Sequence, residues 1–392
     1  MRFVFFKHQL TFPRQTGHDV HTAEMMRALG AKGHSVVFLS RTAPDAGALD
    51  SLGLASAEVL AAEDADSEFR PEGLQARFFS YWGIDPRFAA AVASACRRHQ
   101  ADVLVSVGLD ALPYLVGSHH ALRIWYAADE WVLHHLSQLR LFDRSTWINV
   151  HHAAIKGVYQ QAFARSVDRV WVVTERDRWA ARWIAGIRGV DVVPNGVDTD
   201  YFTPRAVDER PDSAVFWGRL DFGPNIQGLE WFVRSVWPAV RRARPDAVFR
   251  IIGFKPGEAV KRLAAQPGVM LEADLVDLRD EVCRHAVAVV PMVSGLGIKN
   301  KLLEAAAMGR AALCTSRATL GLNLPTTPPM IVADDPAEWV TTLLALWDDS
   351  ARRHALGEAV RRWVTECHSW AFAADRALRG VETSLQSASS RS

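Results

Sequence analysis

A short stretch in the second half of the chain joins a glycine-rich turn to charged side chains. "SGLGIKNKLLEAAAMG" runs from Ser294 to Gly309 and contains Lys299, Lys301 and Glu304. The glycines predict a loop, and the residues after them predict a helix that Gly309 terminates. A glycine loop at a helix N-terminus leaves backbone N–H groups free, and the helix dipole favours negative charge there. The stretch therefore predicts an anion site.

Glu304 would extend this site by one helical turn. A carboxylate only accepts hydrogen bonds, so it suits vicinal hydroxyl groups such as those of a ribose. A phosphate at the helix start and a ribose one turn along describe a nucleoside diphosphate. The alternative interpretation is an ordinary strand–helix loop, with solvated lysines and Glu304 paired to Lys301. This stretch alone leaves both interpretations open.

A second loop favours the nucleotide. "AVFWGRLDFGPN" places Gly218 and Arg219 directly after a strand-like run. An arginine at the carboxyl edge of a sheet can bind two phosphate oxygens through its planar guanidinium group. Two phosphate-capable loops in one half of the chain are a stronger indication than either loop alone.

The elements that must position these loops are alternating strands and helices. The chain has 392 residues, of which 49% are apolar, so it can form two packed domains. Short β-branched runs alternate with amphipathic helical patterns, which is typical of parallel sheets. Turn residues between Val193 and Ser213 indicate the boundary. We therefore predict an α/β fold with two doubly wound, Rossmann-like domains, in which ligands bind beyond the carboxyl ends of the strands, in the cleft between the domains.

Composition narrows the class of partner and the compartment. Lys and Arg (45) nearly balance Asp and Glu (44), which argues against a nucleic-acid partner. The scattered cysteines predict free thiols in a reducing compartment. We expect a cytoplasmic protein, and peripheral contact with the inner face of a membrane stays open. A metal site is the less favoured interpretation of the three His-His pairs. The tryptophans of the first half are expected to pack in the core rather than to stack on sugars; they include Trp125, Trp131, Trp147 and Trp179.

Several of these segments resemble a known family. "VVPNGVDTDYFTP", "VFWGRLD" and "GIKNKLLEAAAMGRAALCT" are similar to hallmark segments of the family 4 retaining glycosyltransferases, which have the GT-B fold. "TGHDVHTAEMMRALGAKGHSVVFLS" resembles their opening loop, helix and strand. "PNIQGLEWFVRSVWPAVRRARPDAVFRIIG" resembles the branch associated with exopolysaccharide synthesis. "HSWAFAADRAL" resembles the terminal helix that crosses back to the first domain.

The resemblance implies a different role for each of three parts of the chain. Residues 1–195 would form the acceptor-side domain, residues 196–366 the nucleotide-sugar donor domain, and residues 367–392 the returning helix and a polar, frayed tail. Glu304 matches the second Glu of the family's Glu-x7-Glu element, which is expected on the donor ribose. Arg219 matches the arginine expected on the diphosphate.

Further roles follow from the same resemblance. The catalytic candidates are Arg219, Lys301 and Asp129, of which Asp129 falls near the position that touches the donor sugar. His18 and His21 are acceptor candidates. The implied donor-binding set is Gly17, Gly218, Arg219, Asn225, Gly297, Ile298, Lys301, Leu303 and Glu304.

The chain departs from the family pattern at two positions. Leu296 stands where the first Glu of Glu-x7-Glu would be, and Pro224 or Asn225 stands where a lysine usually follows the arginine. Members of the exopolysaccharide-type branch share both departures, and Lys301 or, as the less favoured alternative, Lys299 could supply the missing cation.

The resemblance implies a retaining glycosyltransferase that uses a UDP-sugar or GDP-sugar. The acceptor could be a glycan, a lipid-linked molecule, a protein or a small molecule. We expect no cofactor and no metal, because the acidic pairs at Asp129-Glu130 and Asp348-Asp349 are adjacent in sequence and would point apart. Two alternatives remain: a non-catalytic nucleotide-sugar-binding subunit, and a nucleotide-sugar epimerase, which would need further carboxylates and histidines in the cleft.

Overall fold

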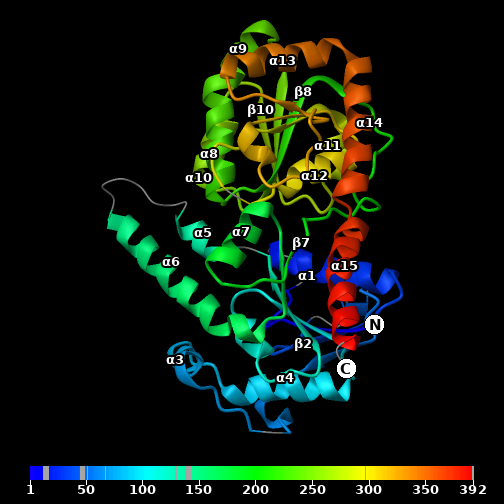
Figure 1. Ribbon diagram of the computed structural model, residues 1–392. Helices are drawn as coiled ribbons and strands as arrows, with labels where there is room; N and C mark the ends of the chain where they lie inside the picture. Colours follow the sequence, from blue (N-terminus) through cyan, green and yellow to red (C-terminus); the bar gives the residue numbers. More distant parts are fainter. Residues whose placement is uncertain are drawn as a thin grey trace. The chain divides into compact units, whose positions relative to one another are not determined.

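The chain folds into two compact units. The computed structural model describes residues 1–11, 17–44, 49–50, 52–66, 68–128, 130–136, 144–295 and 297–390. The first unit comprises Met1–Pro194 and Ala373–Ser392, and the second unit comprises Asn195–Phe372 (Figure 1). Each unit has its own parallel sheet and its own core, so each is described by itself.

The sheet of the first unit has seven parallel strands in the order β3-β2-β1-β4-β5-β6-β7. Its central strands are buried along nearly their whole length, as expected where helices cover both faces of a sheet. The strands are β1 (Arg2–Phe6), β2 (Ser35–Ser40), β3 (Ser56–Val59), β4 (Val103–Val107), β5 (Leu122–Ala127), β6 (Arg169–Val172) and β7 (Val190–Val192).

The helices of the first unit begin at recognisable caps. Asp85 accepts a hydrogen bond from the Arg87 amide at the start of α4, and Thr174 forms a capping box with Asp177 at the start of α7. The helices are α1 (Gly17–Ala31), η1 (Ala62–Asp64), α3 (Gly73–Tyr81), α4 (Pro86–Arg98), η2 (Leu112–Leu115), α5 (Trp131–Leu136), α6 (Arg144–Phe163), η3 (Ala164–Ser166) and α7 (Glu175–Trp183).

The C-terminal helix α15 (Trp370–Ser389) packs on the first unit from Ala373 onward. Asp375 pairs with Lys32 at 2.6 Å, and Arg169 donates to Ser384 at 3.0 Å. The helix continues to Ser389, past Leu385, where the polar tail was expected to begin.

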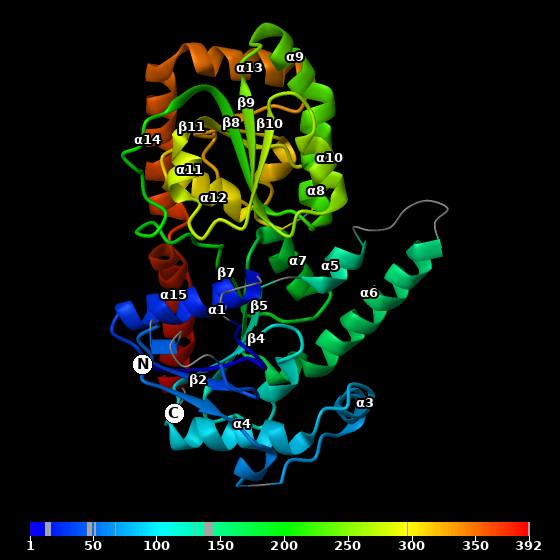
Figure 2. The same ribbon diagram turned by 180° about the vertical axis from the view of Figure 1, so that it is seen from behind.

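The sheet of the second unit has six parallel strands in the order β10-β9-β8-β11-β12-β13. Figure 2 shows helices on both sides of these strands, with α8 and α10 on one side and α11 and α12 on the other. The strands are β8 (Arg210–Arg219), β9 (Val248–Phe254), β10 (Val269–Ala273), β11 (His285–Val290), β12 (Ala312–Cys314) and β13 (Ile331–Val332). The helices are α8 (Gly223–Trp231), η4 (Phe232–Val236), α9 (Trp237–Ala243), α10 (Glu258–Ala264), α11 (Arg279–Arg284), α12 (Asn300–Ala307), η5 (Ser316–Thr319), α13 (Pro336–Asp348) and α14 (Ser350–Cys367).

A wide turn interrupts the helical segment that follows β8. A π-helical turn, η4, separates α8 from α9. Pro238 lies in the first turn of α9 and has no backbone N–H, so the regular bonding pattern cannot pass through it.

Both sheets reverse their strand order once. The reversal lies between β1 and β4 in the first unit and between β8 and β11 in the second. In open parallel sheets, ligands bind beyond the carboxyl ends of the strands at this reversal. Two edges are therefore candidates for a functional site. Among the described residues, no helix has both the length and the apolar character that crossing a membrane requires.

Candidate functional site

The reversal of the second sheet brings the two predicted phosphate loops together. Strand β8 ends in Gly218 and Arg219, and α12 begins at Asn300, after the glycine loop that follows β11. Gly218 has φ = +140°, and a Cβ atom there would lie 3.3 Å from Nδ2 of Asn225 and 3.4 Å from Nζ of Lys301. Glycine thus provides both the backbone conformation and the room that lets Lys301 lie against the strand.

Lys301 has neutral partners. Its Nζ donates to Oδ1 of Asn225 at 2.6 Å and lies 4.1 Å from the centroid of the Phe216 ring. Nδ2 of Asn225 in turn donates to the carbonyl oxygen of Arg219 at 2.7 Å, which fixes the orientation of the amide. Burial lowers the pKa of Lys301 to about 7. An amine held in this way gains most from an anionic ligand, because the ligand would supply the counter-charge.

Glu304 lies one helical turn beyond Lys301. Its Oε2 accepts a hydrogen bond of 2.6 Å from Nε1 of Trp217, a residue on β8. Burial raises the pKa of Glu304, and the hydrogen bond from Trp217 opposes that shift. The alternative interpretation, in which Glu304 is simply the partner of Lys301, is wrong in its hydrogen bonding, because each group is bonded to a neutral side chain instead.

Lys299 precedes the helix rather than forming part of it. Helix α12 begins at Asn300, and Lys299 is its N-cap residue with φ = −92° and ψ = +94°. The angle of about 200° that two residues of helical spacing would place between Lys299 and Lys301 therefore does not apply. The Nζ of Lys299 donates to the carbonyl oxygen of Gly297 at 2.5 Å, and burial lowers its pKa to about 8. Lys299 therefore tethers the glycine loop.

Arg219 is the more exposed cation of the site. Its Nε donates to Oδ1 of Asp221 at 2.9 Å, and the arginine lowers the pKa of that carboxyl group. The side chain of Arg219 is 46% exposed, so its remaining N–H groups can reach a ligand from solvent.

The other predicted donor residues of the second unit differ in burial. Gly297 is exposed. Ile298 is half-buried against the core, and Leu303 is fully buried within it, so the Leu303 side chain supports α12 and offers no surface to a ligand. Leu296 lies outside the described residues.

The reversal of the first sheet carries histidines and aspartates. Gly17 begins α1, and His18 is half-buried beside it. His21 is 4% exposed, and its Nδ1 lies 3.1 Å from the Tyr126 hydroxyl group. Asp19, on the same helix, is buried and pairs with Lys7 at 2.9 Å. Asp129 lies outside the described residues.

Two further residues at this edge were not singled out from the sequence. Nε2 of His8 lies 3.2 Å from the carbonyl oxygen of Asp110, and burial lowers the pKa of His8. A Cβ atom on Gly108, which has φ = +94°, would lie 2.7 Å from Oδ1 of Asp110 and 3.7 Å from Nδ1 of His18. Their positions in the sequence could have indicated them, because His8 lies shortly after the end of β1 and Asp110 shortly after the end of β4.

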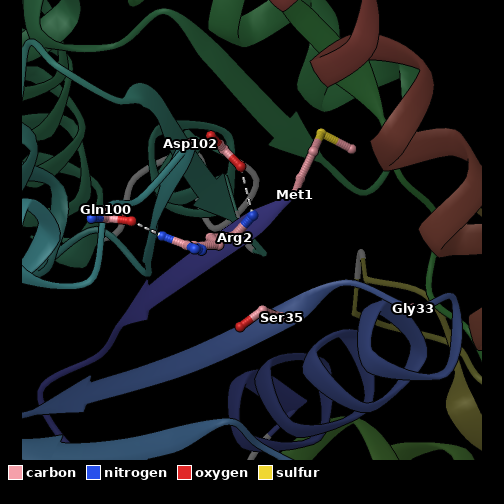
Figure 3. Close-up of a pocket in the computed structure, with 6 residues that line it drawn as sticks. All are labelled: Met1, Arg2, Gly33, Ser35, Gln100 and Asp102. Atoms are coloured by element: carbon pink, nitrogen blue, oxygen red, sulfur yellow. Dashed lines mark hydrogen bonds between the residues drawn. The ribbon is translucent and has the colours of Figure 1, made fainter.

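A hollow lies elsewhere, at the amino ends of β1, β2 and β4. Its volume is about 530 Å³, and its lining includes Arg2, Gln100 and Asp102. Figure 3 shows two hydrogen bonds from Arg2. Its side chain donates to Oε1 of Gln100, and its backbone amide donates to Oδ2 of Asp102 at 2.7 Å. The polar groups of this hollow are thus satisfied, and it lies at the edge opposite the one where parallel sheets bind ligands.

Comparison with known proteins identifies the class of the chain. Residues 16–201 match the family described as Glycosyltransferase Family 4, and residues 211–349 match Glycosyl transferases group 1. Among solved structures, sucrose-phosphate synthase from Thermosynechococcus elongatus has a TM-score of 0.68 at 14% identity, with 99% of each chain covered. Anabaena HepE in complex with UDP and glucose has a TM-score of 0.66 at 12% identity, covering 97% of this chain and 99% of that one.

The chain therefore has the GT-B fold, with two parallel-sheet, Rossmann-like domains. Residues 16–201 thus match a glycosyltransferase family 4 domain, and residues 211–349 match a glycosyltransferase group 1 domain. One curated relative, from Corynebacterium glutamicum, is 27% identical over 207 residues; it is a GDP-mannose-dependent monoacylated α-(1-6)-phosphatidylinositol monomannoside mannosyltransferase. The match covers 47% of this chain and 54% of the relative, so it spans about half of the relative's length.

Proposed function

We propose that the chain is a retaining glycosyltransferase whose second unit binds a nucleoside diphosphate sugar and whose first unit binds the acceptor. The observation that best supports this proposal is the position of Lys301 at the start of α12, one turn before Glu304. Its buried amine donates a hydrogen bond to the neutral side-chain amide of Asn225. Such an amine suits a diphosphate, and the carboxylate suits a ribose diol. By name, the Corynebacterium relative depends on GDP-mannose, and the HepE structure contains UDP, so both bases are candidates for this donor.

In this proposal, the main chemical task is to stabilise the departing diphosphate. Negative charge develops on the phosphate oxygens as the bond to the anomeric carbon breaks. Lys301, Arg219 and the free N–H groups at the start of α12 would meet that charge. The acceptor oxygen would bond to the anomeric carbon on the same face of the sugar ring from which the phosphate departs. The leaving phosphate would assist the acceptor hydroxyl group.

The position of Lys301 supports its role as the compensating cation. Asn225 stands near the point where related enzymes carry a lysine after the arginine. The Lys301 amine reaches Asn225 from α12, so the positive charge arrives at that point from another element. We propose that this charge makes turnover independent of a divalent metal. Dialysis against EDTA is expected to leave the initial rate unchanged, and a requirement for added Mg²⁺ or Mn²⁺ would contradict the proposal.

We further propose a cytoplasmic role in polysaccharide or glycoconjugate synthesis, with an acceptor hydroxyl on a glycan, lipid-linked molecule, protein or small molecule. The epimerase and non-catalytic alternatives are not favoured, because the matched families and the curated relative are transferases.

The deciding experiment is a thermal-shift screen with UDP- and GDP-sugars, followed by product analysis. Donor at a hundred times its dissociation constant is expected to stabilise the protein by about 2.7 kcal/mol. Transfer, or slow hydrolysis with retained configuration by NMR, would support the enzyme. A donor that binds and is recovered unchanged with every acceptor tried would favour the binding subunit, and a donor converted to its epimer would favour the isomerase.

A further inference from the structure

The long helix α6 carries apolar side chains on its outward face. Trp147 is 78% exposed, Val150 38% and Val158 44%. With the exposed Ala154, they recur at helical spacing and form one stripe. Helices on a solvated surface place such residues inward. The prediction that Trp147 packs in the core is therefore wrong.

The inward face of the same helix combines apolar side chains of the core, such as Tyr159 and Phe163, with polar ones. Gln160 is 1% exposed and donates to Oε1 of Glu130 at 2.9 Å. The Nζ of Lys156 lies 2.9 Å from Nε2 of His135 and 4.2 Å from the centroid of the Trp131 ring. Gln160 and Lys156 thus have partners within the first unit, and the stripe of apolar side chains on the same helix faces outward.

Helix α3 extends this surface. Its Tyr81 is 67% exposed and the following Trp82 is 50% exposed. The Phe78 ring of α3 packs against Tyr159 of α6 at 5.1 Å, so the helices lie side by side, as Figure 1 shows. An open hollow of about 270 Å³ lies between them, and its lining includes Phe78, Tyr81 and Val158. We call the surface of Tyr81, Trp82, Trp147, Val150, Ala154 and Val158 the aromatic face.

The charge within helices α3 and α6 has one sign, although the exposed Glu72 stands at the N-cap of α3. Helices α3 and α6 contain Arg, Lys and His but no Asp or Glu along their described lengths. Arg77, His151 and His152 are exposed on them. A symmetric dimer through this face would bring like charges together. An anionic bilayer matches it better, because the bilayer presents apolar depth beneath negative headgroups, and Trp and Tyr favour that boundary.

We propose that the aromatic face docks the protein on the surface of a lipid bilayer that contains anionic headgroups. Trp147, Val158 and Tyr81 would enter the headgroup–acyl boundary, while the basic side chains would stay at the headgroup level. The contact uses neither the donor loops nor the first-sheet reversal, so it can be tested without donor or acceptor.

The test is co-sedimentation of the full chain with vesicles of phosphatidylcholine alone or mixed with phosphatidylglycerol. We expect binding to the mixed vesicles that weakens as salt rises. The variant Tyr81→Gln/Trp147→Gln/Val158→Gln should lower the partition coefficient at least about tenfold, because each buried apolar side chain contributes about 1.5–3 kcal/mol. The matched control, Met270→Gln/Leu320→Gln, removes two side chains of the second unit that are each 42% exposed and should bind like the parent.

Three results would overturn the proposal. One is no sedimentation with either vesicle, and another is equal loss of binding in the control variant. The third is a dimer in size-exclusion chromatography with light scattering that the triple variant abolishes, which would assign the face to a second copy of the chain. Circular dichroism melting of the triple variant should match the parent, because all three positions are exposed, so a loss of binding cannot be attributed to unfolding.

Discussion

The two sheets reverse in the same way, but their carboxyl edges carry different chemistry. At the β8/β11 edge, Lys301 and Lys299 are buried and donate hydrogen bonds to neutral acceptors. Burial lowers the pKa of both amines. At the β1/β4 edge, the charge of Lys7 is already neutralised, since Lys7 pairs with the buried Asp19. His8 lies there beside Asp110.

This difference shows how one fold supports two tasks. The parallel sheet supplies an open edge in each unit, but the side chains at that edge select the ligand. An edge whose buried amines donate to neutral acceptors gains from a dianion. An edge whose charges are already matched gains little from an anion and is better suited to hydroxyl groups, which need donors and acceptors rather than net charge. The predictions below test this division, from the largest expected effect to the smallest.

The largest effect is expected from Lys301→Met. Removing the amine should weaken UDP or GDP binding about ten- to hundredfold, because a hydrogen bond to a charged group is worth about 1.5–3 kcal/mol. Binding of the nucleoside without phosphate should change little. Calorimetric titration with both ligands provides the measurement.

Two lysines serve as controls for that variant. Lys261→Met removes an exposed amine that pairs with Glu258 on α10, and it should bind like the parent. Lys299→Met removes the tether to Gly297 and should lose less affinity than Lys301→Met. If Lys299 carries the larger loss, the glycine loop rather than Lys301 dominates diphosphate binding.

A smaller effect is expected from Glu304→Gln. The amide keeps one acceptor but loses the charge, so nucleotide affinity should fall about five- to tenfold. A nucleotide that lacks the 2′- and 3′-hydroxyl groups should bind parent and variant equally, if Glu304 acts on the ribose. Equal losses for both nucleotides would place the role of Glu304 elsewhere, for example in holding Trp217 on β8. The exposed Glu258→Gln is the matched control.

The sequence predicted local features well because they depend on neighbours in the chain. The glycine loop, the turn at Gly309 and the alternation of strands and helices follow from backbone preference and periodicity. Gly309 indeed has φ = +64° directly after α12. The parallel sheets likewise follow from that alternation.

The sequence did not predict the contacts between segments that are distant in the chain. The bond from Trp217 to Glu304 and the bond from Lys301 to Asn225 join residues 87 and 76 positions apart. They depend on the strand order, which periodicity does not specify. The outward Trp147 was missed for another reason: an apolar stripe predicts a buried face, but the pattern does not show whether protein covers it.

A subtler effect is proton uptake on donor binding. Free Lys301 has a pKa of about 7, so near pH 7 about half of the molecules carry the charge. A bound diphosphate favours the charged amine and raises its pKa, so binding should take up about half a proton. Affinity should therefore fall as the pH rises above about 7. Titrations in buffers of different ionisation enthalpy measure the uptake, which should vanish in Lys301→Met. Uptake that persists in the variant would assign the proton to another group, Lys299 being the next candidate.

The smallest effect on the donor is expected from changes at the first-sheet edge. His8→Ala removes a ring that lies 3.2 Å from the Asp110 carbonyl oxygen but carries no uncompensated charge, since burial lowers its pKa and favours the neutral form. Affinity for UDP or GDP should change less than about twofold, which corresponds to well under 1 kcal/mol. If the edge binds acceptor hydroxyl groups, the acceptor KM should rise while nucleotide affinity stays constant. A loss of nucleotide affinity comparable to that of Lys301→Met would contradict the division between the two edges. A normal KM with a reduced kcat would instead mean that His8 acts after the acceptor has bound.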